Sequence, residues 1–289
     1  MKNRLCDLHM HTTASDGTES VGEVIEKAYA KGLRIISITD HDTVTAVAEA
    51  QKLKKSDMEI IPGAEFSCFF MDGERRVDCH ILAYFIDCGH KDISEIVEIG
   101  KRKRREKLLA RVEYLEKEYG ISIPECEIAP LMNMNAVAKP HLARVLIKMG
   151  YGSEVGEVIR KYLSGYKTPD SRIDAGLVIR AIHNAGGVAV YAHSLGGEHE
   201  VHLGHGEVTR NIDCAVRLGI DGVECYYSRY SPEEIDMLLT IAKGRGLLVS
   251  GGSDYHGENK TVPIGVLCSN GDGCCESRLN VLRYLYEKM

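Results

Sequence analysis

The sequence of 289 residues predicts an α/β fold in which a parallel sheet closes into a barrel. Short apolar runs rich in β-branched residues alternate with stretches of helical periodicity, and this alternation favours parallel strands joined by crossover helices. Residues with metal-ligand chemistry recur directly after the apolar runs. A barrel brings all its strand ends to one rim, whereas an open sheet gathers ligands at a single switch point, so the recurrence favours a barrel.

The expected strands are short apolar runs that lead into polar residues. They lie at 5–11, 35–42, 59–67, 79–84, 187–193 and 247–256. Apolar residues at helical spacing predict a helix over 19–31. A second helix over 43–55 follows Asp42, which we expect to be its N-cap, and a later helix begins at Ser231 or Pro232.

The segment 101–165 interrupts this alternation. Its apolar residues recur at helical spacing on two stretches, and it contains no strand-like run that leads into a metal-ligand residue. We therefore expect a barrel domain built from 1–100 and 166–289. Residues 101–165 would form a helical insertion that caps the mouth of the barrel.

Nine residues with metal-ligand chemistry mark the strand-like runs. They are His9, His11, Asp16, His41, Glu65, His80, His193, Asp254 and His256. Residues two apart on an extended strand point the same way, so His9 and His11 can present two imidazoles to one ion. Mixed histidine and carboxylate ligands favour zinc, manganese or iron over calcium, which prefers oxygen alone.

Each of these residues also has a simpler interpretation. A single histidine or aspartate after a strand is more often a cap, a turn or a surface group. Their recurrence after most of the apolar runs favours one site that holds several metal ions. Glu224 and Tyr226, at the end of a further strand-like run, are expected to line this site without binding metal.

The motifs DLHMHTTASDG, TDHD, GAEF, AHS and GGSDYHG, together with the isolated His80, resemble those of the polymerase-and-histidinol-phosphatase (PHP) family of metal-dependent phosphoesterases. The resemblance covers roughly 4–100 and 170–257, with the motifs in the family's order. Within the family, the chain is most similar to nucleoside 3',5'-bisphosphate phosphatases and short-RNA 5'-exonucleases. The resemblance implies a distorted, TIM-like (β/α)7 barrel of seven strands.

The resemblance also implies three metal ions at the C-terminal end of the barrel. The first ion would be bound by His9, His11, Glu65 and Asp254. The second would share Glu65 as a bridge and add His80 and His193. The third would be bound by Asp16, His41 and His256. Asp16 stands where the histidinol-phosphatase branch tends to carry histidine, and Ser194 stands where many members carry proline after the ligand histidine.

Basic residues of the insertion approach the substrate in the resembled branch. This implicates Arg102, Arg105, Lys139, His141 and Arg144 in phosphate binding. For the run 101–105, a solvated helix face is the simpler alternative. Asp42 and His141 are candidates to protonate the leaving oxygen, and each has the alternative role of orienting a neighbouring ligand.

Composition and charge restrict the classes of partner. The net charge is −6 and the isoelectric point is near 6.1, so there is no overall attraction to nucleic acid or to a membrane. No apolar run is long enough to span a bilayer, and a strand rather than a secretory signal opens the chain. The ten dispersed cysteines are expected to be reduced in a cytoplasmic protein, with Cys274-Cys275 in an exposed turn.

The expected function is hydrolysis of a phosphate ester by a hydroxide that two or three divalent ions (manganese, zinc or iron) activate. The expected substrate is a nucleoside 3',5'-bisphosphate, an AMP-like nucleotide or a short 5'-phosphorylated oligoribonucleotide. An insertion over the mouth disfavours duplex nucleic acid, and the oligomeric state is left open.

Three other functions are alternatives to this one. Histidinol-phosphate hydrolysis is disfavoured by Asp16. An amidohydrolase acting on C–N bonds also begins with a His-x-His pair, but it usually carries a bridging lysine on a mid-chain strand, where this chain has Glu65. A non-catalytic metal-binding module would be expected to lack some of the nine ligands.

Overall fold

The computed structural model describes residues 3–166, 172–198 and 201–287. Within these ranges one twisted sheet has the strand order β8-β7-β6-β4-β3-β2-β1-β9, with β5 beside β3. The strands are β1 (Leu5–Met10), β2 (Leu33–Ile38), β3 (Glu59–Asp72), β4 (Arg75–Tyr84), β5 (Ile173–Asp174), β6 (Val188–Tyr191), β7 (Gly222–Tyr227), β8 (Leu248–Gly252) and β9 (Cys274–Cys275).

The two ends of this sheet approach each other and nearly close it. The chain after β8 bridges the end of β1 in parallel through Met10 and Tyr255, and Asp254 N–H donates to the His9 carbonyl over 2.8 Å. A Cβ on Gly252 would lie 2.2 Å from the Cβ of His9, so only glycine allows β8 to come this close to β1. The seven longer strands therefore form a nearly closed barrel, which confirms the predicted fold class.

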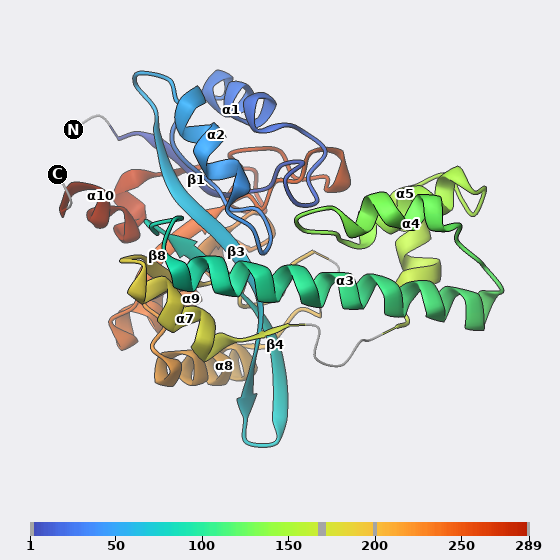
Figure 1. The fold of residues 1–289 in the computed structure, drawn as a ribbon. Coiled ribbons are helices and arrows are strands. Elements are labelled where there is room, and N and C mark those ends of the chain that lie inside the picture. Colours follow the sequence, from blue (N-terminus) through green and yellow to red (C-terminus); the bar gives the residue numbers. More distant parts are fainter. Residues whose placement is uncertain (1–2, 167–171, 199–200, 288–289) are drawn as a thin grey trace.

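One part of the barrel departs from a strict alternation of strand and helix. Strands β3 and β4 form a long antiparallel hairpin that projects from the barrel, and β4 is also antiparallel to β6 (Figure 1). The link between them is only Gly73 and Glu74, and so short a link can join only antiparallel strands. His80 lies inside β4, as the strand predicted over 79–84 requires. Glu65 lies inside β3, so the prediction that it stands at the end of its strand is wrong.

The helices surround the barrel and extend to one side of it (Figure 1). They are α1 (Val21–Ala30), α2 (Thr45–Leu53), α3 (Lys91–Tyr119), α4 (Glu125–Met132), α5 (Lys139–Lys148), α6 (Val155–Val158), α7 (Ala175–Asn184), α8 (His205–Leu218), α9 (Pro232–Arg245) and α10 (Arg283–Glu287). A short π-helix, η1 (Ile159–Leu163), follows α6, and the 3-10 turns are η2 (Gly257–Asn259), η3 (Glu276–Arg278) and η4 (Asn280–Leu282).

The first residues of α1, α2 and α9 test the helix positions and N-caps that the sequence predicts. Helix α1 confirms the helix predicted over 19–31, and Ser231 is the N-cap of α9, as predicted. The N-cap of α2 is Val44, so the prediction for Asp42 is wrong. Asp42 has φ +52°, and its carboxylate accepts hydrogen bonds from Ser67 N–H and Arg104 instead.

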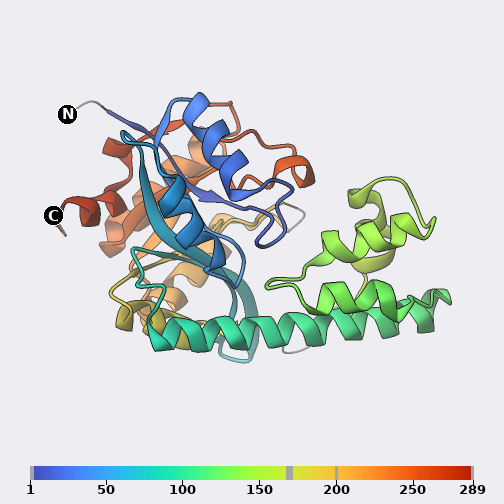
Figure 2. The same cartoon turned by 45° about the horizontal axis from the view of Figure 1, so that its top comes forward.

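Helix α3 joins the barrel to a helical body that Figure 2 shows at its side. Near its start, Ile93 and Ile96 belong to the hydrophobic core of the barrel. Further along, Leu108 and Leu115 belong to a separate hydrophobic cluster with residues of α4, α5 and η1. The expected boundary between 100 and 101 thus falls inside one continuous helix, which both bodies share.

All ten cysteines are free, which agrees with the expected reduced state. Cys274 and Cys275 do not form the expected exposed turn, because they make up β9 and pair antiparallel with β1, and Cys274 is buried. No helix of the described residues is both long enough and apolar enough to cross a membrane.

Candidate metal centre

Four of the predicted ligands converge where β1 meets the chain after β8. His9 and His11 are both fully buried on the same face of the first strand and its extension. Their Nε2 atoms lie 3.3 Å from Glu65 Oε2, and they lie 3.5 and 3.4 Å from Asp254 Oδ1. One ligand atom from each of these four residues lies within 4.8 Å of the other three, which is close enough for all four to bind a single ion.

Glu65 connects this group to a second one. Its Oε2 lies 2.9 Å from His41 Nδ1, and its Oε1 lies 2.9 Å from His80 Nδ1 and 3.0 Å from His193 Nε2. His80 and His193 face each other at 3.1 Å. The hairpin therefore supplies both Glu65 and His80. They are diagonal neighbours, because Glu65 lies opposite Leu82, two residues from His80 on β4.

A third group surrounds the carboxylate of Asp16. Its Oδ1 lies 3.3 Å from His256 Nε2, 3.9 Å from His41 Nε2 and 4.0 Å from His11 Nδ1. His11 and His41 thus each belong to two groups. The structure brings all nine predicted ligands together, and the division of these residues among individual ions stays a prediction.

The donor atoms of this cluster fit divalent cations. His9 Nε2, His11 Nε2, His41 Nδ1 and Glu65 Oε2 are buried and have no hydrogen-bond partner within the described residues. Buried polar atoms are normally paired, so four unpaired donors and acceptors in one place indicate a missing partner of positive charge. Neutral imidazoles and carboxylates are the ligands that zinc, manganese and iron accept.

The charges of the cluster also fit a cation. Burial opposes ionisation of Glu65, yet His41, His80 and His9 hold the pKa of its carboxyl well below the usual value. Burial opposes protonation of His11, but the nearby carboxylates of Asp254 and Glu65 raise its pKa to about 9. Burial lowers the pKa of His80 and of His256 to about 4. Protons on His9 and His11 thus balance the carboxylates in the metal-free protein, and bound metal would replace them.

Several neighbouring groups hold the predicted ligands in place. Glu224, fully buried, accepts from His9 Nδ1–H over 3.0 Å and from His193 N–H over 2.8 Å. Tyr227 donates to Asp254 Oδ2 over 2.8 Å, and Lys260 pairs with the same oxygen. Neither Glu224 nor Tyr226, which were predicted to line the site, is among the residues that line its pocket. Glu224 instead contacts the predicted ligands from the buried side.

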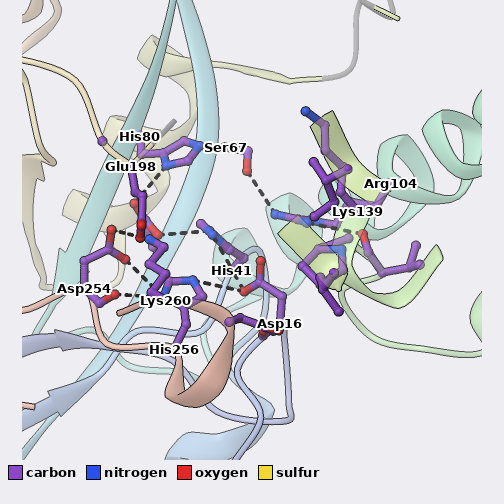
Figure 3. Close-up of a pocket in the computed structure, with 18 of the residues that line it drawn as sticks. Asp16, His41, Ser67, His80, Arg104, Lys139, Glu198, Asp254, His256 and Lys260 are labelled. Carbon is purple, nitrogen blue, oxygen red and sulfur yellow. Dashed lines mark hydrogen bonds and ion pairs between the residues drawn. The ribbon is translucent and has the colours of Figure 1, made fainter. Parts of the chain in front are cut away.

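The cluster opens into a pocket of about 450 Å³ between the barrel and the helical body. In Figure 3, His41, Asp254 and Lys260 lie on one side, and Arg104 and Lys139 lie on the other. The basic residues that line the pocket are Arg104, Lys107, Arg111, Lys139, Arg160, Arg172 and Lys260. The pocket thus combines a predicted metal centre with a wall of positive charge.

Of the basic residues that the sequence implicates, Lys139 lines this pocket. Arg102 is exposed and pairs with Glu106, and Arg144 donates to Asn259 Oδ1 over 2.8 Å. Neither of them, nor Arg105, is among the lining residues. The sequence argument missed Arg104, Lys107 and Arg111, and their spacing of three and four residues was the available signal, because such residues share one face of a helix.

The two acid–base candidates have different surroundings. Asp42 lines the pocket, and Arg104 Nε donates to its Oδ2 over 2.6 Å. Burial opposes its ionisation, but Arg104 and the Ser67 N–H keep its pKa below the usual value. His141 does not line the pocket, and its Nδ1 accepts from Ala138 N–H over 3.0 Å. An ionised Asp42 held in this way favours the orienting role over proton donation.

Comparisons with known proteins agree with this site. The family model for the PHP domain matches residues 7–164. The 5'-3' exoribonuclease Rnm of Salmonella typhimurium is 32% identical over 86% of this chain and 84% of its own length. A 3',5'-nucleoside bisphosphate phosphatase of Chromobacterium violaceum is 29% identical over 86% of each chain.

Among solved structures, a chain from Bifidobacterium adolescentis described as a candidate metal-dependent phosphoesterase matches with a TM-score of 0.78. It is 28% identical, and the match covers 93% of this chain and 94% of that one. Fold and site together define a phosphoric ester hydrolase that depends on metal ions. The chain belongs to the PHP domain family.

Proposed function

We propose that this protein hydrolyses a phosphate ester of a nucleotide, either a nucleoside 3',5'-bisphosphate or AMP-like molecule or a short 5'-phosphorylated oligoribonucleotide. The observation that carries the proposal is the pocket, in which the cluster around Glu65 faces a basic wall. Relatives named as an exoribonuclease and a bisphosphate phosphatase support the same substrate class.

Two or three divalent ions (manganese, zinc or iron) would occupy the centre. His9, His11, Glu65 and Asp254 would hold one, and Glu65, His80 and His193 a second. Asp16, His41 and His256 would hold a third. Ions bound there would neutralise phosphoryl oxygens and acidify water so that it can attack phosphorus at neutral pH.

The residues of the chain itself have separate tasks. Glu224 fixes the tautomer and the direction of His9, because it accepts the proton of Nδ1 and leaves Nε2 free. Lys260 and Lys139 line the pocket on opposite sides and can contact phosphoryl oxygens as point charges. Asp42 orients the loop that carries His41, and His141 stays a candidate for proton transfer.

The position of the helical body restricts the substrate. Lys139 and Pro140 at the start of α5 line the pocket together with Asp16 and His256 of the barrel. A pocket of about 450 Å³ between two walls admits a nucleotide or the end of a single strand. Duplex nucleic acid is wider than such an opening, so we expect it not to be a substrate.

The experiment that tests this function is phosphate release by manganese-loaded protein from a panel of phosphate esters. The panel contains AMP, adenosine 3',5'-bisphosphate, a 5'-phosphorylated short RNA and histidinol phosphate, with Asp254→Ala as the inactive control. We expect turnover of nucleotide substrates that Asp254→Ala abolishes. Exclusive turnover of histidinol phosphate, or no turnover by the native protein, would contradict the proposal.

A further inference from the structure

The turn η2 lies against the loop that carries Asp16, a predicted ligand of the third ion. Asp16 and His256 come from different loops of the barrel, and Asp16 Oδ1 lies 3.3 Å from His256 Nε2 (Figure 3). Thr18 Oγ1 accepts from the Glu258 N–H over 2.9 Å. A Cβ on Gly257 would lie 2.0 Å from the same hydroxyl oxygen. The turn is therefore packed directly against the loop of Asp16.

Asn259 in this turn contacts both the barrel and the helical body. Its Nδ2 donates to the backbone carbonyl of Asp16, and its Oδ1 accepts from Arg144 Nη2 over 2.8 Å. Only this orientation of the amide satisfies both partners, because a carbonyl can only accept and a guanidinium can only donate. Arg144 lies on α5, whose Leu142 and Leu146 belong to the hydrophobic cluster of the helical body. One side chain thus joins the helical body to the loop of a predicted ligand.

The loop of Asp16 has a separate support from inside the barrel. Asp40, only 2% exposed, accepts from the Thr12 N–H over 2.8 Å and from the Ser15 hydroxyl over 2.6 Å. These bonds fix the first part of the loop, whereas Asn259 holds the carbonyl of Asp16. Loss of Asn259 should therefore displace Asp16 without unfolding the loop.

We propose that Asn259 is a positioning residue that couples closure of the helical body over the pocket to binding of the third ion. Arg144 orients the amide of Asn259. The amide in turn fixes the loop from which the Asp16 carboxylate reaches His256. This inference rests on the proposed metal centre and adds to it a link outside the nine ligands. Coupling between two binding or closing events is reciprocal, so the bound third ion also opposes opening of α5.

Calorimetric titration of the metal-free full chain with manganese tests this link. The ion that Asp16→Asn fails to bind identifies the third ion. We expect Asn259→Ala to lower the affinity for that ion by about tenfold, as is typical when a group that orients a ligand is lost, and to leave the other ions unchanged. Arg144→Met should lower the same affinity. The matched control is Lys148→Met, an exposed cation of the same helix that pairs with Glu127 of the helical body.

A double variant separates a link through Asn259 from two unrelated structural effects. If Arg144 acts through Asn259, adding Arg144→Met to Asn259→Ala lowers the manganese affinity no further, whereas independent effects would add. Arg144→Lys keeps a donor and should retain more of the native affinity than Arg144→Met. Additive losses in the double variant, or native affinity of Asn259→Ala for the third ion, would overturn the proposal.

Hydrogen exchange of the metal-free protein provides a readout that does not depend on metal binding. We expect faster exchange of α5 and of residues 12–18 in Asn259→Ala, and native rates in Lys148→Met. Native rates in both variants would overturn the link. A native protein that binds no manganese would contradict the proposed metal centre, while faster exchange in Asn259→Ala would still support the link. If Asn259→Ala fails to fold, Arg144→Met allows both measurements.

Discussion

At the scale of single residues, Glu65 links the whole centre, because its two oxygens face different sets of histidines. Oε2 approaches His9, His11 and His41, while Oε1 approaches His80 and His193. Glu224 holds the same arrangement in place, since it accepts one hydrogen bond from the His9 ring and another from the His193 backbone N–H. A carboxylate accepts both bonds, whereas an amide offers only one acceptor oxygen.

Replacing Glu224 with glutamine should therefore weaken metal binding without removing a predicted ligand. Loss of such a supporting partner typically costs about 10-fold to 100-fold in metal affinity. Calorimetric titration with manganese measures the change, and Glu233→Gln, an exposed residue of α9, is the control. Equal affinities of Glu224→Gln and the native protein would show that Glu224 does not position His9.

The pH dependence of the folding stability of the metal-free protein follows from the raised pKa of His11. Its pKa is raised from 6.5 to about 9, so its contribution to folding stability is complete below pH 6.5 and is lost as the pH rises through about 9. Manganese competes with the same proton, so its stabilising effect should grow over this range. Thermal denaturation with a chelator and with manganese, between pH 6.5 and 9, measures both trends. A constant difference in Tm between the two series would contradict this explanation.

At the scale of elements, α3 is fixed to the barrel by the Arg104–Asp42 pair, whose side chains are 13% and 2% exposed. This pair connects the basic residues of α3 that line the pocket to the loop that carries His41. Removal of one partner leaves the other charge buried and uncompensated.

Arg104→Met should thus destabilise the protein by about 3–5 kcal/mol, as is typical of a broken buried pair. Urea denaturation measures this free energy. The exposed Lys54–Glu59 pair provides the control, and Lys54→Met should cost no more than about 1 kcal/mol. Similar losses for the two variants would mean that Arg104 does not anchor α3.

Much of the barrel and of the centre could be predicted at this scale, because the apolar pattern of β1 and β8 is local. His9 lies within β1, His11 directly follows it, and Asp254 and His256 follow β8. The β3–β4 hairpin was missed, although Asp72-Gly73 between apolar stretches is a known hairpin signal. That Lys107 and Arg111 line the pocket could not be predicted from the sequence alone, since which face of α3 meets the pocket depends on packing of the helical body against the barrel.

At the scale of the whole molecule, two bodies share α3 (Figure 2), and each has its own hydrophobic cluster. Residues of both bodies line the pocket. The cluster that includes Leu142, Leu146 and Leu163 is separate from the barrel core. A separate core that is connected mainly through one helix can open without unfolding the rest.

Hydrogen exchange should therefore show α4 and α5 as one cooperative unit, less protected than β2 and β7 of the barrel. Manganese should raise the protection of the barrel strands more than that of α4 and α5. Uniform protection of both bodies, with and without metal, would contradict the division of the chain into a barrel and a helical insertion.

The central claim is that the cluster around Glu65 binds metal ions that hydrolyse a phosphate ester. The most direct test measures phosphate release from adenosine 3',5'-bisphosphate as manganese is added to metal-free native protein, to Glu65→Gln and to Glu95→Gln, an exposed control on α3. We predict that activity rises with bound manganese in the native protein and in Glu95→Gln, and that Glu65→Gln stays inactive while it remains folded. Activity without metal, or native-like activity of folded Glu65→Gln, would contradict the claim.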